Sequence, residues 1–147
     1  MVVNMKKHFR FLEHTADVYV EAYGDSLEEA FGNAALASTD VMTEVDKVEA
    51  RNEETFMVEA SDEYALLYSW LEEVLLEFDL KGKLYCRFEV LGIEEISGGF
   101  RLHARAWGEK FDPEKHPSKV GIKSVTYHRM EIVKKPESVT VRFILDI

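Results

Sequence analysis

The sequence predicts an α+β fold, a single domain over residues 1–147 with mainly antiparallel β-sheets and two amphipathic helices packed on the sheet. Apolar residues recur at helical spacing twice, after Ser26 and after Asp62. Strand-like segments come in pairs between and after these helices, rather than alternating with them one by one. A chain of 147 residues buries roughly two thirds of its unfolded surface, so one ordinary hydrophobic core is expected.

The N-terminal part is predicted to form two strands and then a helix. Residues 8–12 and 18–22 alternate between apolar and other side chains, as half-buried strands do. Ser26 and Glu29 have the spacing of a capping box, and apolar residues then recur at helical intervals to about Thr39. We therefore expect the first helix to begin after Ser26.

The second helix is predicted from Asp62 to Gly82. A strand-like segment at residues 55–58 precedes it, Asp62 can cap its N-terminus, and Gly82 is suited to end it. Its apolar stripe is wide enough to cover a sheet and consists of Leu66, Leu67, Trp70, Leu71, Val74, Leu75 and Phe78.

The C-terminal half is predicted to be mostly strand. Residues 83–96 and 100–106 flank a Ser-Gly-Gly turn and are typical of a hairpin. A polar loop with two prolines follows at residues 108–121 and is expected at the surface. The last two strands are expected at residues 123–133 and 138–146.

The net charge indicates which partners to expect. At a formal charge of −10, the chain is unsuited to bind a phosphate backbone directly, because such affinity comes from Lys and Arg. The sequence shows no signal peptide and no apolar run of about 20 residues. We expect a soluble, cytoplasmic protein that contacts RNA, if at all, through another protein.

Common catalytic motifs are missing. The sequence contains no P-loop, no GxGxxG, no nucleophile elbow and no HExxH. The single cysteine, Cys86, lies in a strand-like segment and is predicted to be a small core residue rather than a nucleophile. Independent nucleotide hydrolysis or acyl transfer therefore has little support.

Carboxylates mark the most informative candidate site. The last strand brings Asp146 next to the terminal carboxylate of Ile147, and Asp17 opens a strand after the polar run at residues 13–17. If these strands are neighbours, Asp17, Asp146 and Ile147 supply oxygen ligands for a hard divalent cation. The alternative is that Asp17 is a turn residue and Asp146 a solvated acid.

Two histidines are further candidates. His14 could orient a carboxylate or bind a metal, although a histidine at a strand end is commonly a satisfied structural residue. His116 lies in the polar loop and could contact a partner or ligand, or could be an exposed histidine without a role.

Four lysines gather around the polar loop of this acidic chain: Lys110, Lys115, Lys119 and Lys123. Such a cluster could bind a phosphate or an acidic partner surface, or could only increase solubility.

Four segments together resemble the archease family. They are Glu13-His14-Thr15-Ala16-Asp17, Trp70-Leu71-Glu72-Glu73-Val74-Leu75, the segment from His116 to His128, and Asp146-Ile147. The resemblance extends over essentially the whole chain. It implies a protein that is not an enzyme but activates the RtcB-type tRNA-splicing RNA ligase, which joins RNA ends using GTP and manganese. The activator would promote ligase guanylylation and multiple turnover.

The resemblance also implies roles for particular residues. The metal-binding acids of the family fall on Asp17 and Asp146, with Ile147 adding main-chain or terminal oxygens. Calcium is the expected ligand in vitro, and the physiological divalent ion stays open. A functional lysine of the family matches Lys123 or, as the second choice, Lys110.

Two other functions remain as alternatives. A stand-alone metal-dependent enzyme would turn over a small substrate without a partner. A chaperone-like binding module would bind many clients through an exposed apolar patch. The sequence argues against the latter, because the apolar stripes of both helices are predicted to be used by the core.

Overall fold

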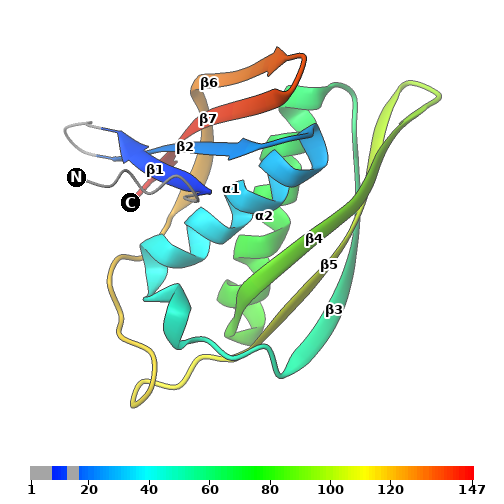
Figure 1. Cartoon of the computed structure of the whole chain (residues 1–147). Helices are drawn as coiled ribbons and strands as arrows, with labels where there is room; N and C mark the ends of the chain where they lie inside the picture. Colours follow the sequence, from blue (N-terminus) through cyan, green and yellow to red (C-terminus); the bar gives the residue numbers. More distant parts are fainter. Residues whose placement is uncertain (1–7, 13–16) are drawn as a thin grey trace.

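The computed structural model describes residues 8–12 and 17–147, which form two antiparallel sheets with two helices between them (Figure 1). Sheet A has the strand order β1-β2-β7-β6, and sheet B has the order β3-β5-β4. The strands are β1 (Phe9–Leu12), β2 (Val18–Gly24), β3 (Asn52–Ala60), β4 (Lys83–Ile96), β5 (Gly99–Lys110), β6 (Ser124–Lys135) and β7 (Ser138–Asp146). The predicted α+β class is confirmed, and the structure adds that the helices contact both sheets.

Helix α1 (Leu27–Met42) begins where the capping box predicted. The Ser26 hydroxyl accepts a hydrogen bond from the backbone N–H of Glu29 at 3.1 Å. The helix runs three residues beyond Thr39, and a short 3-10 turn at Val45–Lys47 follows it.

Helix α2 (Glu63–Lys81) also has the predicted ends. The Asp62 carboxylate accepts from the Ala65 N–H at 2.8 Å, and Gly82 ends the helix in the left-handed conformation at φ 66°. Neither helix is long and apolar enough to cross a membrane, nor is any other in the part of the chain that the structure describes.

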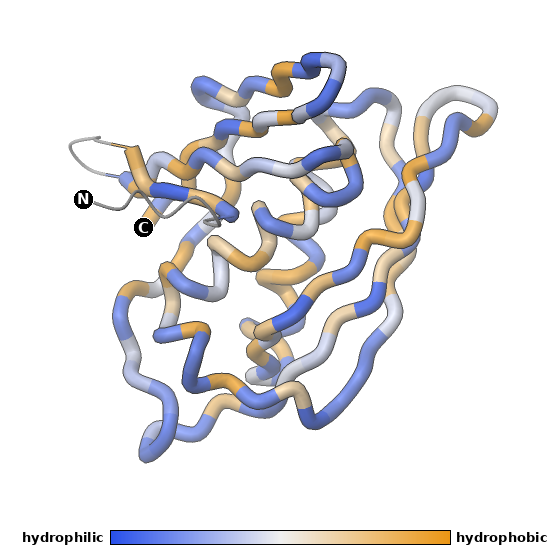
Figure 2. Tube along the Cα trace, in the orientation of Figure 1, coloured by the Kyte–Doolittle hydropathy of each residue, from blue (hydrophilic) through white to orange (hydrophobic). Residues whose placement is uncertain are grey.

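Trp70 of α2 is the centre of the core. Its indole N–H donates to the carbonyl oxygen of Phe31 on α1 at 2.9 Å, so the two helices are joined by a buried hydrogen bond. Its ring meets Phe56 of β3 and Phe88 of β4 edge-on, at centroid distances of 5.4 and 6.0 Å. Hydrophobic positions alternate along the strands that enclose this core (Figure 2). Cys86, at the edge of the core, is half-buried as expected.

The apolar stripe of α2 is only part of the helix's apolar surface. The predicted stripe is buried, with Phe78 half-buried at its end. Leu76 and Leu80 lie outside the stripe and are 40% and 76% exposed. The expectation that the core uses the predicted stripe of α2 is therefore confirmed, and the structure adds two exposed leucines that the stripe did not include.

Strand β5 extends further than the sequence predicted. It reaches Lys110, so the loop begins three residues later than expected. Gly108 was taken as a loop glycine, but it pairs with Tyr85 inside the hairpin. A Cβ at this position would lie 1.8 Å from the Leu84 carbonyl oxygen, so the glycine permits close approach of the two strands.

A bulge interrupts β6. The register with β7 jumps between Thr126 and Glu131, and Arg129 adopts the left-handed conformation at φ 57°. Simple alternation along this strand predicted no such break. Tyr127 lies within this bulge and is 54% exposed.

Replacing Gly108 with alanine should destabilise the protein by roughly 1–3 kcal/mol, because the new methyl group overlaps the β4 backbone. Urea unfolding monitored by circular dichroism measures the effect. Gly92→Ala in β4 is the matched control, since a Cβ there meets nothing within 4 Å. Equal stabilities of the two variants would contradict the close-approach role.

Candidate functional site

The pairing of β2 with β7 brings the two candidate aspartates to one end of sheet A. The last register pair at this end is Val18 with Leu145, and Asp17 and Asp146 are the next residues on their strands. On the other side of β7, Asp146 pairs with Ser124, and its carbonyl oxygen accepts from the Lys123 N–H at 2.7 Å. Both aspartates are half-buried. The condition set by the sequence, that their strands be neighbours, is met.

The donor atoms of the described residues Asp17, Asp146 and Ile147 at this strand end are oxygens. Within residues 8–12 and 17–147, no three His, Cys, Asp or Glu side chains are grouped so that they could hold a metal ion. Asp17 and Asp146 provide two carboxylates, and main-chain oxygens of Ile147 follow directly. These oxygen donors are suited to a hard cation such as Ca²⁺, Mg²⁺ or Mn²⁺, whereas zinc sites typically use nitrogen and sulfur donors.

A pocket of about 290 Å³ lies beside Asp17. It opens between β1, β2, the end of α1 and the loop before β6. Its lining is mostly apolar and comprises Phe11, Leu12, Asp17, Val18, Tyr19, Asp40, Val41, Lys119 and Val120. Phe11 and Val120 are 44% and 40% exposed, so the apolar side chains of the pocket beside Asp17 are partly accessible to solvent.

The predicted N-terminal run also contained residues 13–16. His14 falls in residues 13–16, which lie outside the described residues. Its suggested role at the carboxylates therefore stays a prediction.

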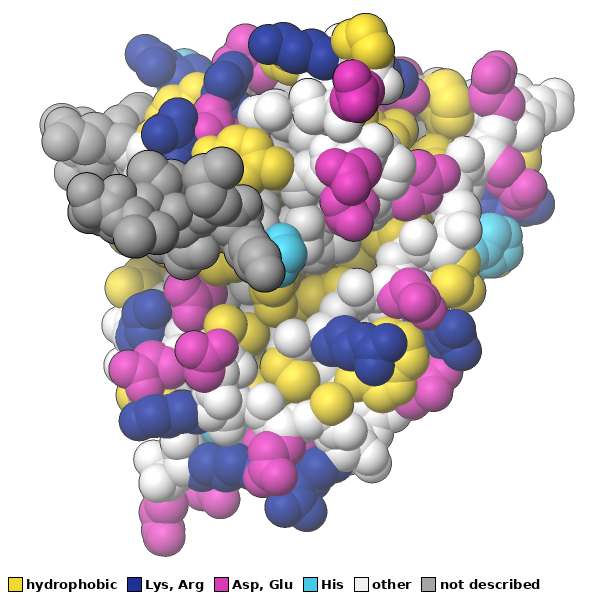
Figure 3. Space-filling model, in the orientation of Figure 1, with side chains coloured by type: hydrophobic (Ala, Val, Ile, Leu, Met, Phe, Trp, Pro, Cys, Tyr) yellow, Lys and Arg dark blue, Asp and Glu magenta, His cyan; other side chains and the backbone are white. Residues whose placement is uncertain are grey.

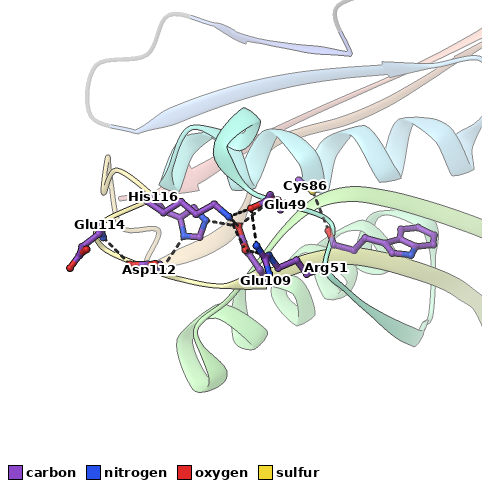
Figure 4. A network of polar contacts seen from close by, with 9 residues as sticks. Glu49, Arg51, Cys86, Glu109, Asp112, Glu114 and His116 are labelled. Atoms are coloured by element: carbon purple, nitrogen blue, oxygen red, sulfur yellow. Dashed lines mark hydrogen bonds and ion pairs between the residues drawn. The ribbon is translucent and has the colours of Figure 1, made fainter.

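His116 is buried, which corrects the expectation of an exposed loop histidine. Its Nδ1 accepts from the Asp112 N–H at 2.9 Å, so the proton of the neutral ring lies on Nε2, which is 2.9 Å from Glu109 Oε2 (Figure 4). A turn in which the His116 N–H donates to the Asp112 carbonyl oxygen directs the ring inward. In this position the His116 side chain has a structural role, because it connects the loop to Glu109.

Glu109 is the centre of this polar network and was not singled out from the sequence. Burial would raise the pKa of its carboxyl group. Hydrogen bonds from Lys115, the Glu49 N–H and His116 outweigh burial and lower the pKa to about 2. Arg51 adds an ion pair at 3.2 Å. No local spacing could have revealed the network, because Glu49 and Glu109 are 60 residues apart.

The four lysines around the loop separate into two kinds. Lys115 forms ion pairs with Glu49 and Glu109. Lys119 caps α1, which has no basic residue in its last turn: its ammonium donates to the Asp40 carbonyl oxygen at 2.5 Å. Lys110 and Lys123 are exposed, and neither forms an ion pair with another described residue.

The loop does not form a continuous basic patch. Acidic and basic side chains are interleaved around the lower end of the face in Figure 3, below the helices. Of the four lysines, only Lys110 and Lys123 are therefore available to bind a phosphate or an acidic surface, as was predicted for the cluster. Lys123 adjoins the aspartates, whereas Lys110 ends β5 in the other sheet.

Comparison with known proteins shows one family. A model of the archease protein family matches residues 9–147. The protein archease of Pyrococcus abyssi is 47% identical over 131 residues, covering 89% of this chain and 92% of that protein. The protein archease of Sulfurisphaera tokodaii is 42% identical over 139 residues, covering 95% and 98%.

Solved structures agree with this result. The solution structure of protein 1598 of Methanobacterium thermoautotrophicum has a TM-score of 0.82 at 39% identity and covers 96% of this chain and 99% of that one. A crystal structure from Thermotoga maritima, described as an archease and possible chaperone, has a TM-score of 0.57 at 18% identity and covers 92% and 94%. The latter shows the shared fold alone.

Replacing Glu109 with glutamine should lower the free energy of unfolding by about 1–3 kcal/mol at pH 6. The folded-state pKa of Glu109 is about 2 against an ordinary value of 4.5. The stabilisation by its charge is therefore complete above pH 4.5 and is lost as the pH falls toward 2. The difference between wild type and variant, measured by urea unfolding, should shrink in that window. Glu114→Gln changes an exposed position of the same loop and should leave the free energy of unfolding unchanged at every pH.

Proposed function

The chain belongs to the archease family, and from this premise we propose that it activates an RtcB-type tRNA-splicing RNA ligase. The activator promotes guanylylation of the ligase by GTP and its repeated turnover, and it does not join RNA itself. Family proteins are named as archeases and not as catalytic enzymes. With a net charge of −10, the chain meets RNA only through the ligase.

The single observation that carries the proposed mechanism is the juxtaposition of Asp17 and Asp146 at the end of β2 and β7. These carboxylates and main-chain oxygens of Ile147 are proposed to hold a divalent cation, calcium in vitro. When bound, the cation neutralises the two acids and offers coordination sites to an outside ligand. The antiparallel ladder keeps both residues at one strand end, where each is half-buried.

Lys123 is proposed as the cationic group of the site. Its backbone N–H is bonded to the Asp146 carbonyl oxygen, so the start of the lysine side chain is fixed beside the acids. In the complex, the carboxylates would approach the metal- and GTP-containing cleft of the ligase, and the lysine would meet a phosphate or a carboxylate. Lys110 is the weaker choice because it lies at the end of sheet B.

A chaperone-like binding module is the second candidate function. Exposed Leu76 and Leu80 favour it, since the core does not use the whole apolar surface of α2. It predicts that the protein suppresses aggregation of unrelated unfolding proteins, independently of Asp17 and Asp146.

Asp17→Asn and Asp146→Asn should each abolish stimulation of a purified RtcB-type ligase, because asparagine keeps the shape of the side chain but removes its charge. The measurement is GTP-dependent guanylylation with manganese, with the variant in excess over the ligase. Asp25→Asn, in the exposed turn before α1, is the control and should stimulate like wild type.

Normal stimulation by both variants would show that the carboxylate site is wrong. Absence of stimulation by wild type with a compatible ligase, together with suppression of aggregation of citrate synthase, would favour the chaperone-like function.

Calcium should bind the isolated protein and stabilise it. At a concentration about 100-fold above Kd, Tm should rise by roughly 5–10 °C, as expected from ligand linkage for a domain of this size. Titration calorimetry should give one site per chain. Asp146→Asn should remove both signals, whereas Asp25→Asn should keep them; a calcium response that survives in Asp146→Asn would place the cation elsewhere.

A further inference from the structure

Helix α2 carries a row of side chains on its outer side, of which Tyr68 is partly buried against the core and the others lie outside it. Tyr64, Tyr68, Glu72, Leu76 and Leu80 are spaced four residues apart and so form one continuous ridge along the helix. Tyr64, Leu76 and Leu80 are 42%, 40% and 76% exposed. A slanted ridge of this kind is the surface that packs into the groove of another element.

The bulge of β6 extends this row onto sheet A. Tyr127 stacks flat on Tyr68, with ring centroids 4.5 Å apart and an interplanar angle of 7°. The Ile132 N–H donates to the Tyr64 hydroxyl at 3.3 Å, which ties the same end of the helix to β6. We call Tyr64, Tyr68, Leu76, Leu80 and Tyr127 the α2 ridge. Its aromatic end is held in place before any partner arrives, so little ordering is needed on binding.

The α2 ridge is bordered by negative charge. Helix α2 contains five acidic residues and one basic residue, Lys81, which is paired with Glu77. Glu72, Glu73 and Asp79 are exposed, and among the described residues none of them has an ion-pair partner. Burial and the neighbouring charges of Asp62 and Glu72 raise the pKa of Tyr127, which places that ring in the same negative field.

We propose that the α2 ridge is the surface by which this protein docks on its partner, and that it fits an apolar groove rimmed by lysine and arginine on that partner. The inference rests on the proposed function and names the ligase as the occupant. Charge complementarity selects such a groove, because the unpaired acids of α2 would face cations as the leucines and tyrosines become buried. A second copy of the chain is disfavoured, since two acidic helices would face each other.

The α2 ridge and the aspartates are connected through β6. Ser124 pairs with Asp146, and Tyr127 follows Ser124 by three residues, about 10 Å along a strand. Docking through the α2 ridge therefore determines where Asp17 and Asp146 are presented. The α2 ridge provides affinity and the carboxylates provide activation, so the two can be separated by experiment.

The test is a titration of the ligase with this protein, read out as GTP-dependent guanylylation. A variant with Leu76→Ser and Leu80→Ser should need at least about tenfold more protein for half-maximal stimulation, with the same plateau. Met57→Ser is the matched control: Met57 is 61% exposed on β3 and should leave the curve unchanged. Circular dichroism confirms that each variant is folded.

The rim is tested with Glu72→Gln, Glu73→Gln and Asp79→Asn combined. At low salt, more of this variant than of wild type should be needed for half-maximal stimulation. The concentration needed should also depend less on salt, because fewer charge pairs are screened. Sedimentation of the wild type alone should show a monomer.

The outcomes separate the two proposals. If wild type does not stimulate the ligase, the proposed function fails. If wild type stimulates, and the leucine variant has an unchanged half-maximal concentration or the charge variant an unchanged salt dependence, the docking surface is overturned. A wild-type dimer that the leucine variant dissociates would assign the α2 ridge to a second copy and would also overturn it.

Discussion

The antiparallel register between β2 and β7 is the constraint on which the rest of this structure depends. It buries Val20 and Phe143 opposite each other on the face toward the helices. On the other face it pairs Glu21 with Arg142, whose guanidinium donates to the carboxylate at 2.6 Å. A slip of one residue would exchange these faces, place Glu21 in the core and separate Asp17 from Asp146. Stability and the candidate site therefore require the same pairing.

Two carboxylates that are mostly buried, Glu21 and Glu109, are each paired with more than one cationic side chain. Arg10 and Arg142 both contact Glu21, which is only 3% exposed. Burial opposes its ionisation, but hydrogen bonds from Tyr23 and the two arginines outweigh this and lower the pKa of Glu21. Glu109 repeats the arrangement with Lys115 and Arg51. Helix α2 carries part of the excess negative charge of this acidic chain, because Glu72, Glu73 and Asp79 are exposed and form no ion pair with another described residue.

The loop between β5 and β6 is held by contacts that its sequence does not predict. His116 and Lys115 fasten it to Glu109, and Lys119 fastens it to the last turn of α1. The chain then enters β6 with Lys123 bonded to Asp146. The segment predicted to be a polar surface loop thus connects sheet B, α1 and the carboxylate end of sheet A. Because several of its charged residues form these contacts, only some of them are free to meet a partner.

The sequence by itself determined the local elements: both helix N-termini, the Gly82 end, the hairpins and the class of fold. These follow from periodicity and capping, which act over a few residues. It also indicated Asp17 and Asp146 as a pair, on the condition that their strands meet. Only the tertiary structure decided that they do, that His116 turns inward to Glu109, that Gly108 lies inside a strand, and that Tyr127 stacks on Tyr68. Each of these depends on contacts between residues distant in the chain or on a bulge that alternation does not predict, so no local pattern could specify them.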